Sequence, residues 1–199
     1  MNTSTTDRIL SRRTALAGLA GLGAGGLVVA LGAQGARAAQ GMSTADHPLT
    51  GMWLAMANPA RAEDPQVPGP SLFAADGTVV LNWVPAGIGL DGALQYLSIY
   101  MGVWEPHDER TGHFTAVQTT ADATGNLTGT VTVDGHPQVS EDGATFVDTG
   151  VLVTVTIRDA AGKTVAVIPP GPTPRPVTGI KMRVGNPGFP GEENATPTA

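Results

Sequence analysis

Short runs of β-branched residues, separated by turn dipeptides, most strongly constrain what this chain of 199 residues can fold into. Asp-Gly pairs occur at residues 76–77, 91–92, 134–135 and 142–143. Such pairs adopt positive φ at low cost, which tight hairpins require. Helical periodicity is hard to find after residue 39. The pattern therefore predicts an all-β protein.

Two of the runs alternate clearly between apolar and polar residues. Residues 127–133 place leucine, glycine and valine on one face and threonine on the other, and in residues 151–158 the valines and the isoleucine are expected to face inward. Further runs bring the total to about eight to ten strands. They are residues 51–58, 71–73, 78–84, 98–105, 113–120, 144–149, 164–168 and 177–184.

Strands joined mostly by short turns favour an antiparallel up-and-down β-barrel, because closure removes the open edges of a long flat sheet. A β-sandwich is the alternative. We expect the barrel to span residues 48–185, after a flexible start at 40–47 and before a disordered tail at 186–199. Residues 59–70 are interpreted as a proline-rich loop, and residues 169–176 as an extended connector.

Residues 1–39 are typical of an export signal. The paired Arg12 and Arg13 precede an uncharged run at 14–32, and residues 36–38 read Ala-Arg-Ala, a plausible cleavage site. The pair before a weakly apolar segment resembles a twin-arginine (Tat) signal. That resemblance implies passage through the Tat translocase after folding, an extracytoplasmic location and no stable membrane insertion after cleavage. An uncleaved membrane anchor is the alternative.

The composition narrows the function classes. Lysine and arginine number 11 against 17 acidic residues, so the chain lacks the positive field that nucleic-acid binding needs. Residues 1–39 carry four arginines and one aspartate, and their removal takes the formal net charge from −6 to −9. The absence of cysteine excludes disulfides, thiolate-bound zinc, iron–sulfur clusters and thiol catalysis.

The segment Leu-Thr-Gly-Met-Trp at residues 49–53 is similar to the Gly-x-Trp opening strand of the calycins, which include the lipocalins. Residues 102–130 also resemble small secreted lipocalin-like proteins. The resemblance covers residues 48–185. It implies that Trp53 closes one barrel end and packs against a cation of the last strand, for which the chain offers Lys181 and Arg183.

The densest polar cluster lies at residues 105–113 and contains two histidines and three carboxylates. These types could bind a metal or act as acid and base, but the segment also has the composition of a polar hairpin loop, and we expect the loop and no metal site. His47 and His136 do not have metal-ligand spacing. No nucleophile elbow or phosphate-binding loop is present after residue 39, so no cofactor is expected.

The aromatic residues concentrate between residues 73 and 114. Each can pack in a core, but several together can line a barrel cavity, where rings and a few polar groups form a small-molecule site. Gln118 alternates with Phe114 on one face and would anchor a polar group of the ligand. The predicted ligand-binding residues are Trp83, Tyr100, Trp104, Phe114, Gln118 and Phe146.

The sequence therefore predicts an exported barrel that binds a small, largely apolar ligand. One alternative is a cofactor-independent cyclase or isomerase, similar to allene-oxide-cyclase-like barrels, whose site works mainly by holding a substrate conformation. The other is a secreted interaction or inhibitor module with a filled core. A buried Glu, His or Gln in the cavity would favour the enzyme, and a filled interior would favour the module.

Replacement of both Arg12 and Arg13 by lysine should retain the precursor inside the cell, because the Tat translocase recognises the arginine pair. Fractionation and immunoblotting of cells that express the full chain measure this, with Arg8→Lys as the control. Undiminished mature protein in the medium of the double variant would reject the Tat route.

Overall fold

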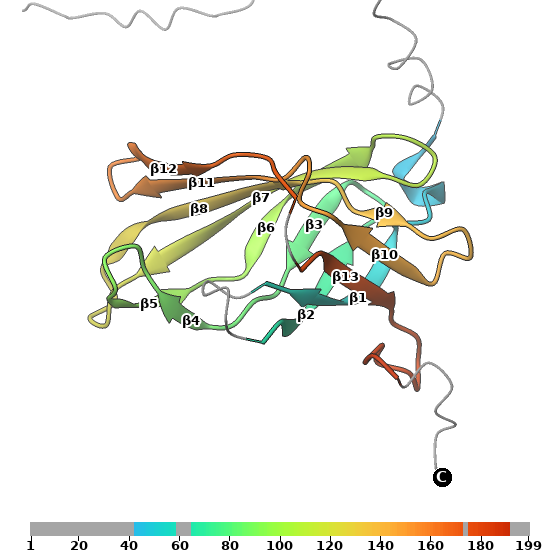
Figure 1. The fold of residues 1–199 in the computed structure, drawn as a ribbon, viewed down its shortest axis with the longest axis horizontal. Helices are drawn as coiled ribbons and strands as arrows, with labels where there is room; N and C mark the ends of the chain where they lie inside the picture. The colour runs from blue at the N-terminus through green and yellow to red at the C-terminus, as the bar shows by residue number, and fades with distance from the viewer. Residues whose placement is uncertain (1–41, 59–64, 173–174, 192–199) are drawn as a thin grey trace, which may run out of the picture. The chain divides into compact units, whose positions relative to one another are not determined.

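The computed structural model describes residues 42–58, 65–172 and 175–191. Within these ranges one antiparallel sheet of 13 strands curls into a barrel, and a 3₁₀ turn at Thr44–Asp46 is the only helical element (Figure 1). The predicted all-β, up-and-down barrel is confirmed. The described part contains no helix of the length and apolar character that a bilayer span needs. The export signal predicted at residues 1–39 lies outside the described residues.

The strand order is β12-β11-β8-β7-β6-β3-β2-β1-β13-β10-β9, with the hairpin β4–β5 attached to β7. The expected runs correspond to ten of the strands, and β4, β5 and β9 had not been expected. The strands are β1 (Gly51–Ala57), β2 (Val67–Phe73), β3 (Thr78–Leu81), β4 (Ala86–Ile88), β5 (Leu94–Leu97), β6 (Tyr100–Pro106), β7 (Gly112–Ala121), β8 (Leu127–Gly135), β9 (Gln138–Val139), β10 (Thr145–Asp148), β11 (Thr154–Asp159), β12 (Thr164–Ile168) and β13 (Val177–Lys181).

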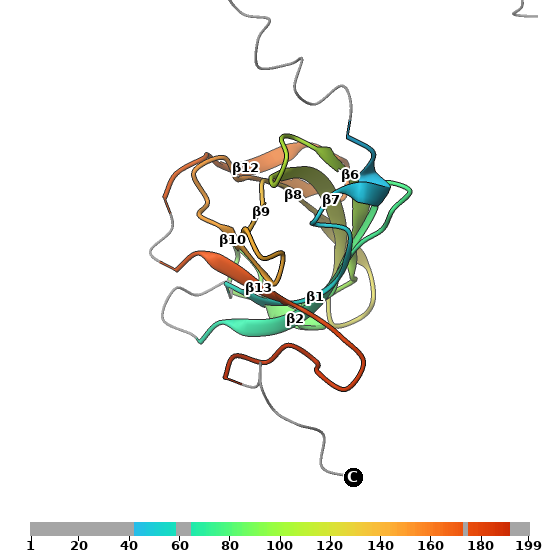
Figure 2. The same cartoon turned by 90° about the vertical axis from the view of Figure 1, so that its right-hand side faces the viewer.

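The sheet closes into a ring at one end, as the end-on view in Figure 2 shows. There β9 continues the path of β8, pairs with β10 and also meets the start of β7. Thr111 bridges Gln138, and the N–H of Val139 donates to the carbonyl of Arg110 at 2.9 Å. At the other end β11 and β12 leave the ring, and β12 pairs with β11 alone among the described strands.

Aromatic side chains fill the closed end. The ring of Phe73 meets the rings of Trp104, Phe114 and Phe146 edge to face, with centroid distances of 5.8, 6.0 and 6.5 Å. Gly179 on β13 makes room for Phe146, because a Cβ atom at this glycine would lie 2.1 Å from the Phe146 ring. The packed core therefore occupies one end of the barrel.

Trp53 on β1 is fully buried in this core, and its Nε1 donates to the carbonyl of Leu49 at 2.8 Å. Its register partner on β13 is Lys181, whose Nζ lies 5.0 Å from the indole centroid and donates to the carbonyl of Pro48 at 2.9 Å. Arg183, the other candidate cation, is exposed and forms an isolated bridge with Asn186. Of the two cations, Lys181 is the one placed over the indole.

Three segments differ from the sequence-based expectations. Residues 67–70, expected within a loop, belong to β2; Pro68 and Pro70 are tolerated there because β2 extends past the end of β3 and pairs only with β1. His47, assigned to a flexible start, is buried and lies edge-on to Trp104 at 5.6 Å. In the tail, residues 186–191 are described and Gly188 is buried.

Trp53→Ala should lower the free energy of unfolding by about 3–5 kcal/mol, because it removes a fully buried aromatic side chain. Lys181→Met should cost about 0.5–2 kcal/mol by removing the cation over the indole. Met52→Ala, on the outer face of the same strand, is the matched control and should change stability by less than about 0.5 kcal/mol. Urea melts measure all three, and a Trp53→Ala cost as small as that of the control would contradict the packing role.

Candidate functional site

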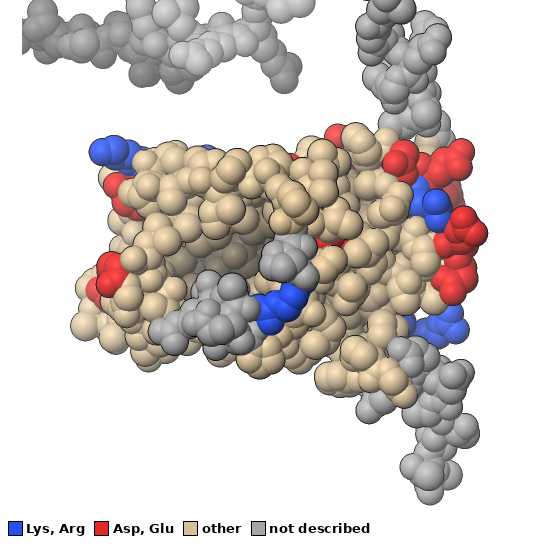
Figure 3. Space-filling view, in the orientation of Figure 1, with Lys and Arg blue, Asp and Glu red and all other residues tan. Residues whose placement is uncertain are grey.

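The barrel is hollow beyond its aromatic end. A cavity of about 1260 Å³ extends through the rest of the interior, and Figure 3 shows a hollow in the face of the barrel. Its walls are formed mainly by small and branched apolar side chains. The apolar lining residues of this kind include Ala55, Ala57, Val67, Leu81, Val131, Val133, Val153, Val155, Ile157, Val165, Ile168 and Val177.

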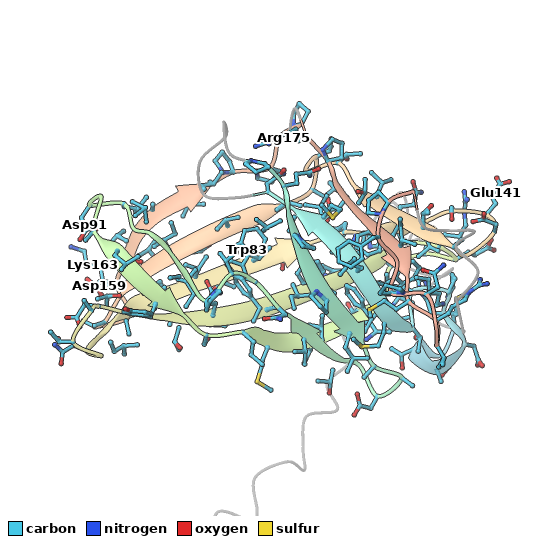
Figure 4. All side chains as sticks on the ribbon, turned by 90° about the horizontal axis from the view of Figure 1, so that it is seen from below. Trp83, Asp91, Glu141, Asp159, Lys163 and Arg175 are labelled. Atoms are coloured by element: carbon cyan, nitrogen blue, oxygen red, sulfur yellow. The ribbon has the colours of Figure 1, made fainter. Side chains whose placement is uncertain are left out.

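The opening lies between strands that are not paired with one another. One side consists of β12 and the connector that follows, with Pro169 and Gly171, and the other of the ends of β1 and β2, with Asn58 and Val67. The hairpin β4–β5 lines the far end of the cavity. Figure 4 shows the charged side chains of Asp91, Asp159 and Lys163 gathered at that far end and Trp83 near the middle of the barrel.

Two polar side chains of the cavity wall, Tyr100 and Gln118, form a candidate binding site. Both point inward from adjacent strands, and the β6–β7 register, which pairs Met101 with Val117, places them opposite one another. Their exposed fractions are only 9% and 2%. Gln118 Nε2 donates to the carbonyl of Ser98 at 2.7 Å, which leaves Oε1 of the amide turned to the cavity.

The Tyr100 hydroxyl and Gln118 Oε1 have no hydrogen-bond partner among the described residues. Burial raises the pKa of Tyr100 to about 12, so its hydroxyl stays protonated and can donate at neutral pH. The amide oxygen of Gln118 can accept. The site therefore offers one donor and one acceptor, side by side on an apolar wall.

Other polar groups of the lining are engaged by the protein itself. The Asp148 carboxylate accepts from the backbone N–H of His136 at 2.8 Å and from that of Gly150 at 3.0 Å. Arg158 donates to the hydroxyl of Thr132 at 2.9 Å. Because these side chains already have hydrogen-bond partners in the protein, they are less available to a bound molecule than Tyr100 and Gln118 are.

Of the six predicted ligand-binding residues, five line the cavity: Trp83, Tyr100, Phe114, Gln118 and Phe146. Trp104 does not. It lies on the inward face of β6 but toward the closed end, where its Nε1 donates to the carbonyl of Ala74 at 2.8 Å. The ring of Phe73 covers it there, so Trp104 belongs to the core that seals the barrel.

Sequence reasoning missed a second polar group, on the outer face of the barrel. Extension of the β7–β8 register beyond the Phe114–Gly135 pair sets His113 opposite His136, and Asp134 lies beside them. We name His113, Asp134 and His136 the outer histidine cluster. The sequence predicts a polar loop at residues 105–113 and a separate turn that contains Asp134 and His136. Only the strand register shows that these residues meet.

Comparisons of the chain with family models, with curated proteins and with solved structures found no match. The class that fold and cavity define is an antiparallel β-barrel with a hollow, mostly apolar interior.

Tyr100→Phe should remove one pH-dependent component of stability. The folded pKa of about 12 exceeds the usual value of 10, so the unfolded state releases the phenol proton first and stability falls as the pH rises from 10 to 12. Urea melts across this range should show a loss in wild type that exceeds that of Tyr100→Phe by up to about 3 kcal/mol. Parallel curves for the two proteins would contradict the burial of this phenol.

Proposed function

We propose that the barrel binds one small, largely apolar molecule in its interior, with Tyr100 and Gln118 as the polar anchor. The observation that carries the proposal is the mostly apolar cavity of about 1260 Å³, lined by these two buried side chains, whose Tyr100 hydroxyl and Gln118 Oε1 have no hydrogen-bond partner among the described residues. A molecule bound in the cavity would supply the hydrogen-bond partners that these two atoms lack.

The lining defines the chemistry of the guest. Drug-sized ligands occupy pockets of about 300–1,000 Å³, so this cavity has room for a lipid, a terpenoid or a polyketide aromatic. A guest that matches the anchor accepts a hydrogen bond from the Tyr100 hydroxyl and donates one to Gln118 Oε1. Arg158 is the one cation among the described lining residues and is bonded to Thr132, so the anchor favours a neutral guest over an anion.

The hollow interior supports a binding protein over an interaction module with a filled core. A cyclase or isomerase is the second candidate, because Gln118 is buried in the cavity and such enzymes need few ionisable groups. Incubation of the chain with each bound compound, followed by mass spectrometry and chromatography, distinguishes the two: a binder returns the compound unchanged, and a cyclase returns an isomer of equal mass and different retention.

Lipocalin-like ancestry and export of the chain are also proposals. Lipocalin-like ancestry is supported by the Gly-x-Trp start of β1 and by the position of Lys181 over Trp53. Export through the Tat translocase to an extracytoplasmic location is supported by Arg12 and Arg13 in the sequence. The proposed partners are thus a small apolar ligand and, during export, the translocase.

A panel of fatty alcohols, terpenoids and polyketide aromatics tests the binding. A bound compound should quench the fluorescence of Trp83 and raise the melting temperature, with about 2.7 kcal/mol of stabilisation at ~100 times its dissociation constant. Gln118→Leu should weaken guests that carry a hydrogen-bond donor by about 1–3 kcal/mol and spare hydrocarbons. Gln138→Leu, the same change at an exposed position of β9, is the matched control.

Either of two results would overturn the proposal. One is a panel in which no compound shifts melting or fluorescence. The other is equal weakening by Gln118→Leu and Gln138→Leu, which would place the guest outside the cavity.

A further inference from the structure

The outer histidine cluster lies on the face of the barrel that the cavity does not use. The imidazole rings of His113 and His136 stack, with centroids 4.4 Å apart and planes at 6°. Oδ1 of Asp134 lies 3.0 Å from Nε2 of His113. One side-chain ligand atom from each of the three residues lies within 4.8 Å of the others. The cluster thus gathers two imidazole nitrogens and a carboxylate oxygen in one place.

We propose that His113, Asp134 and His136 bind one divalent cation of the late first-row transition series, with zinc as the ion to test. Two imidazoles and one carboxylate are a ligand set that tetrahedral zinc accepts, with the fourth position open to water. Calcium and magnesium prefer sites made of oxygen ligands alone, so a site with two imidazole nitrogens fits them poorly.

An unpaired buried atom on one of the two imidazole rings supports the proposal. Nδ1 of His136 is buried and has no hydrogen-bond partner among the residues that the structure describes. It is the only such buried side-chain atom in those ranges. Buried nitrogens and oxygens are almost always paired, and a cation in the cluster would give this nitrogen a partner.

The residues around the cluster hold its ligands in place. The hydroxyl of Thr115 donates to Oδ2 of Asp134 at 2.6 Å, which leaves Oδ1 directed at His113. The backbone N–H of His136 donates to the Asp148 carboxylate and fixes the turn that carries the ring. Hydrogen bonds of this kind orient the ligands of known metal sites.

Binding of a cation requires the ligand atoms to move closer together and the two imidazole rings to turn from their parallel stack. Zinc bonds of about 2.0–2.1 Å in a tetrahedron place ligand atoms about 3.3 Å apart, against the present spread of up to 4.8 Å. The side chains of His113 and Asp134 are 34% and 36% exposed, so the movement takes place at a partly exposed edge of the cluster, where the ring of His113 must turn from its stack on His136.

The position of the cluster defines what the cation would do. His136 precedes Pro137, whose carbonyl accepts from the N–H of Gly112 at the point where the barrel ring closes. A cation held by β7 and by the β8–β9 corner would tie together the two strands that close this ring. The proposed role is therefore structural, and it is independent of ligand binding inside the barrel.

Calorimetric titration of the metal-free full chain with zinc chloride tests the proposal. Wild type should bind one zinc per chain, and the melting temperature should rise with zinc concentration. His113→Gln and His136→Gln, singly and together, should weaken binding by at least about tenfold. Glu109→Gln, an exposed carboxylate of the neighbouring loop, is the matched control and should bind as wild type does.

Asp134→Asn serves as a second test, because it retains the shape of the side chain and its bond to Thr115 while removing the charge. It should also weaken zinc by at least about tenfold. Absorption of the cobalt-loaded chain reports directly on coordination by nitrogen, and the double histidine variant should lose that spectrum. The proposal is overturned if wild type shows no saturable one-to-one binding, or if the histidine variants bind zinc as tightly as Glu109→Gln.

Discussion

The filling of one barrel end by aromatic rings is the constraint on which the rest of the structure depends. Trp53 and Phe73 occupy neighbouring strands there, and the next inward residues along both strands are small. On β1 the next two inward residues are Ala55 and Ala57. The large rings stabilise the closed ring of strands, and the small residues leave a hollow that the same strands enclose.

The sequence predicted the strands well where alternation was long and hairpins were short. It did not predict β9, because two residues beside Pro137 carry no periodic signal, although they close the ring. It also placed Trp104 in the cavity, since inward alternation reports which face a residue occupies and not how far along the barrel it lies. Depth along the axis depends on the stagger between strands, which only the folded sheet defines.

A similar limit applies to the polar residues. Gln118 could be assigned to the interior from its spacing to Phe114, because both lie on one strand. Its relation to Tyr100 depends on the register of β6 against β7, and the meeting of His113 with His136 depends on that of β7 against β8. Strand β7 thus contributes to an apolar cavity with its inward residues and to a cluster of nitrogen and oxygen donors with its outward ones.

The free edge of β12, which pairs with β11 alone among the described strands, affects how a molecule could enter and leave the cavity. The opening lies between β12 with its connector and the ends of β1 and β2, and none of these strands is hydrogen-bonded across it. Two side-chain hydrogen bonds do cross it, because Asn58 Nδ2 and Gln66 Nε2 donate to the carbonyls of Arg175 and Pro176 in the connector at 2.6 and 2.9 Å. A molecule that enters beside them leaves the backbone ladders of the sheet whole. If the proposed guest binds, its residence time would therefore depend on contacts with the walls and on these two hydrogen bonds, and not on the rate at which the barrel unfolds.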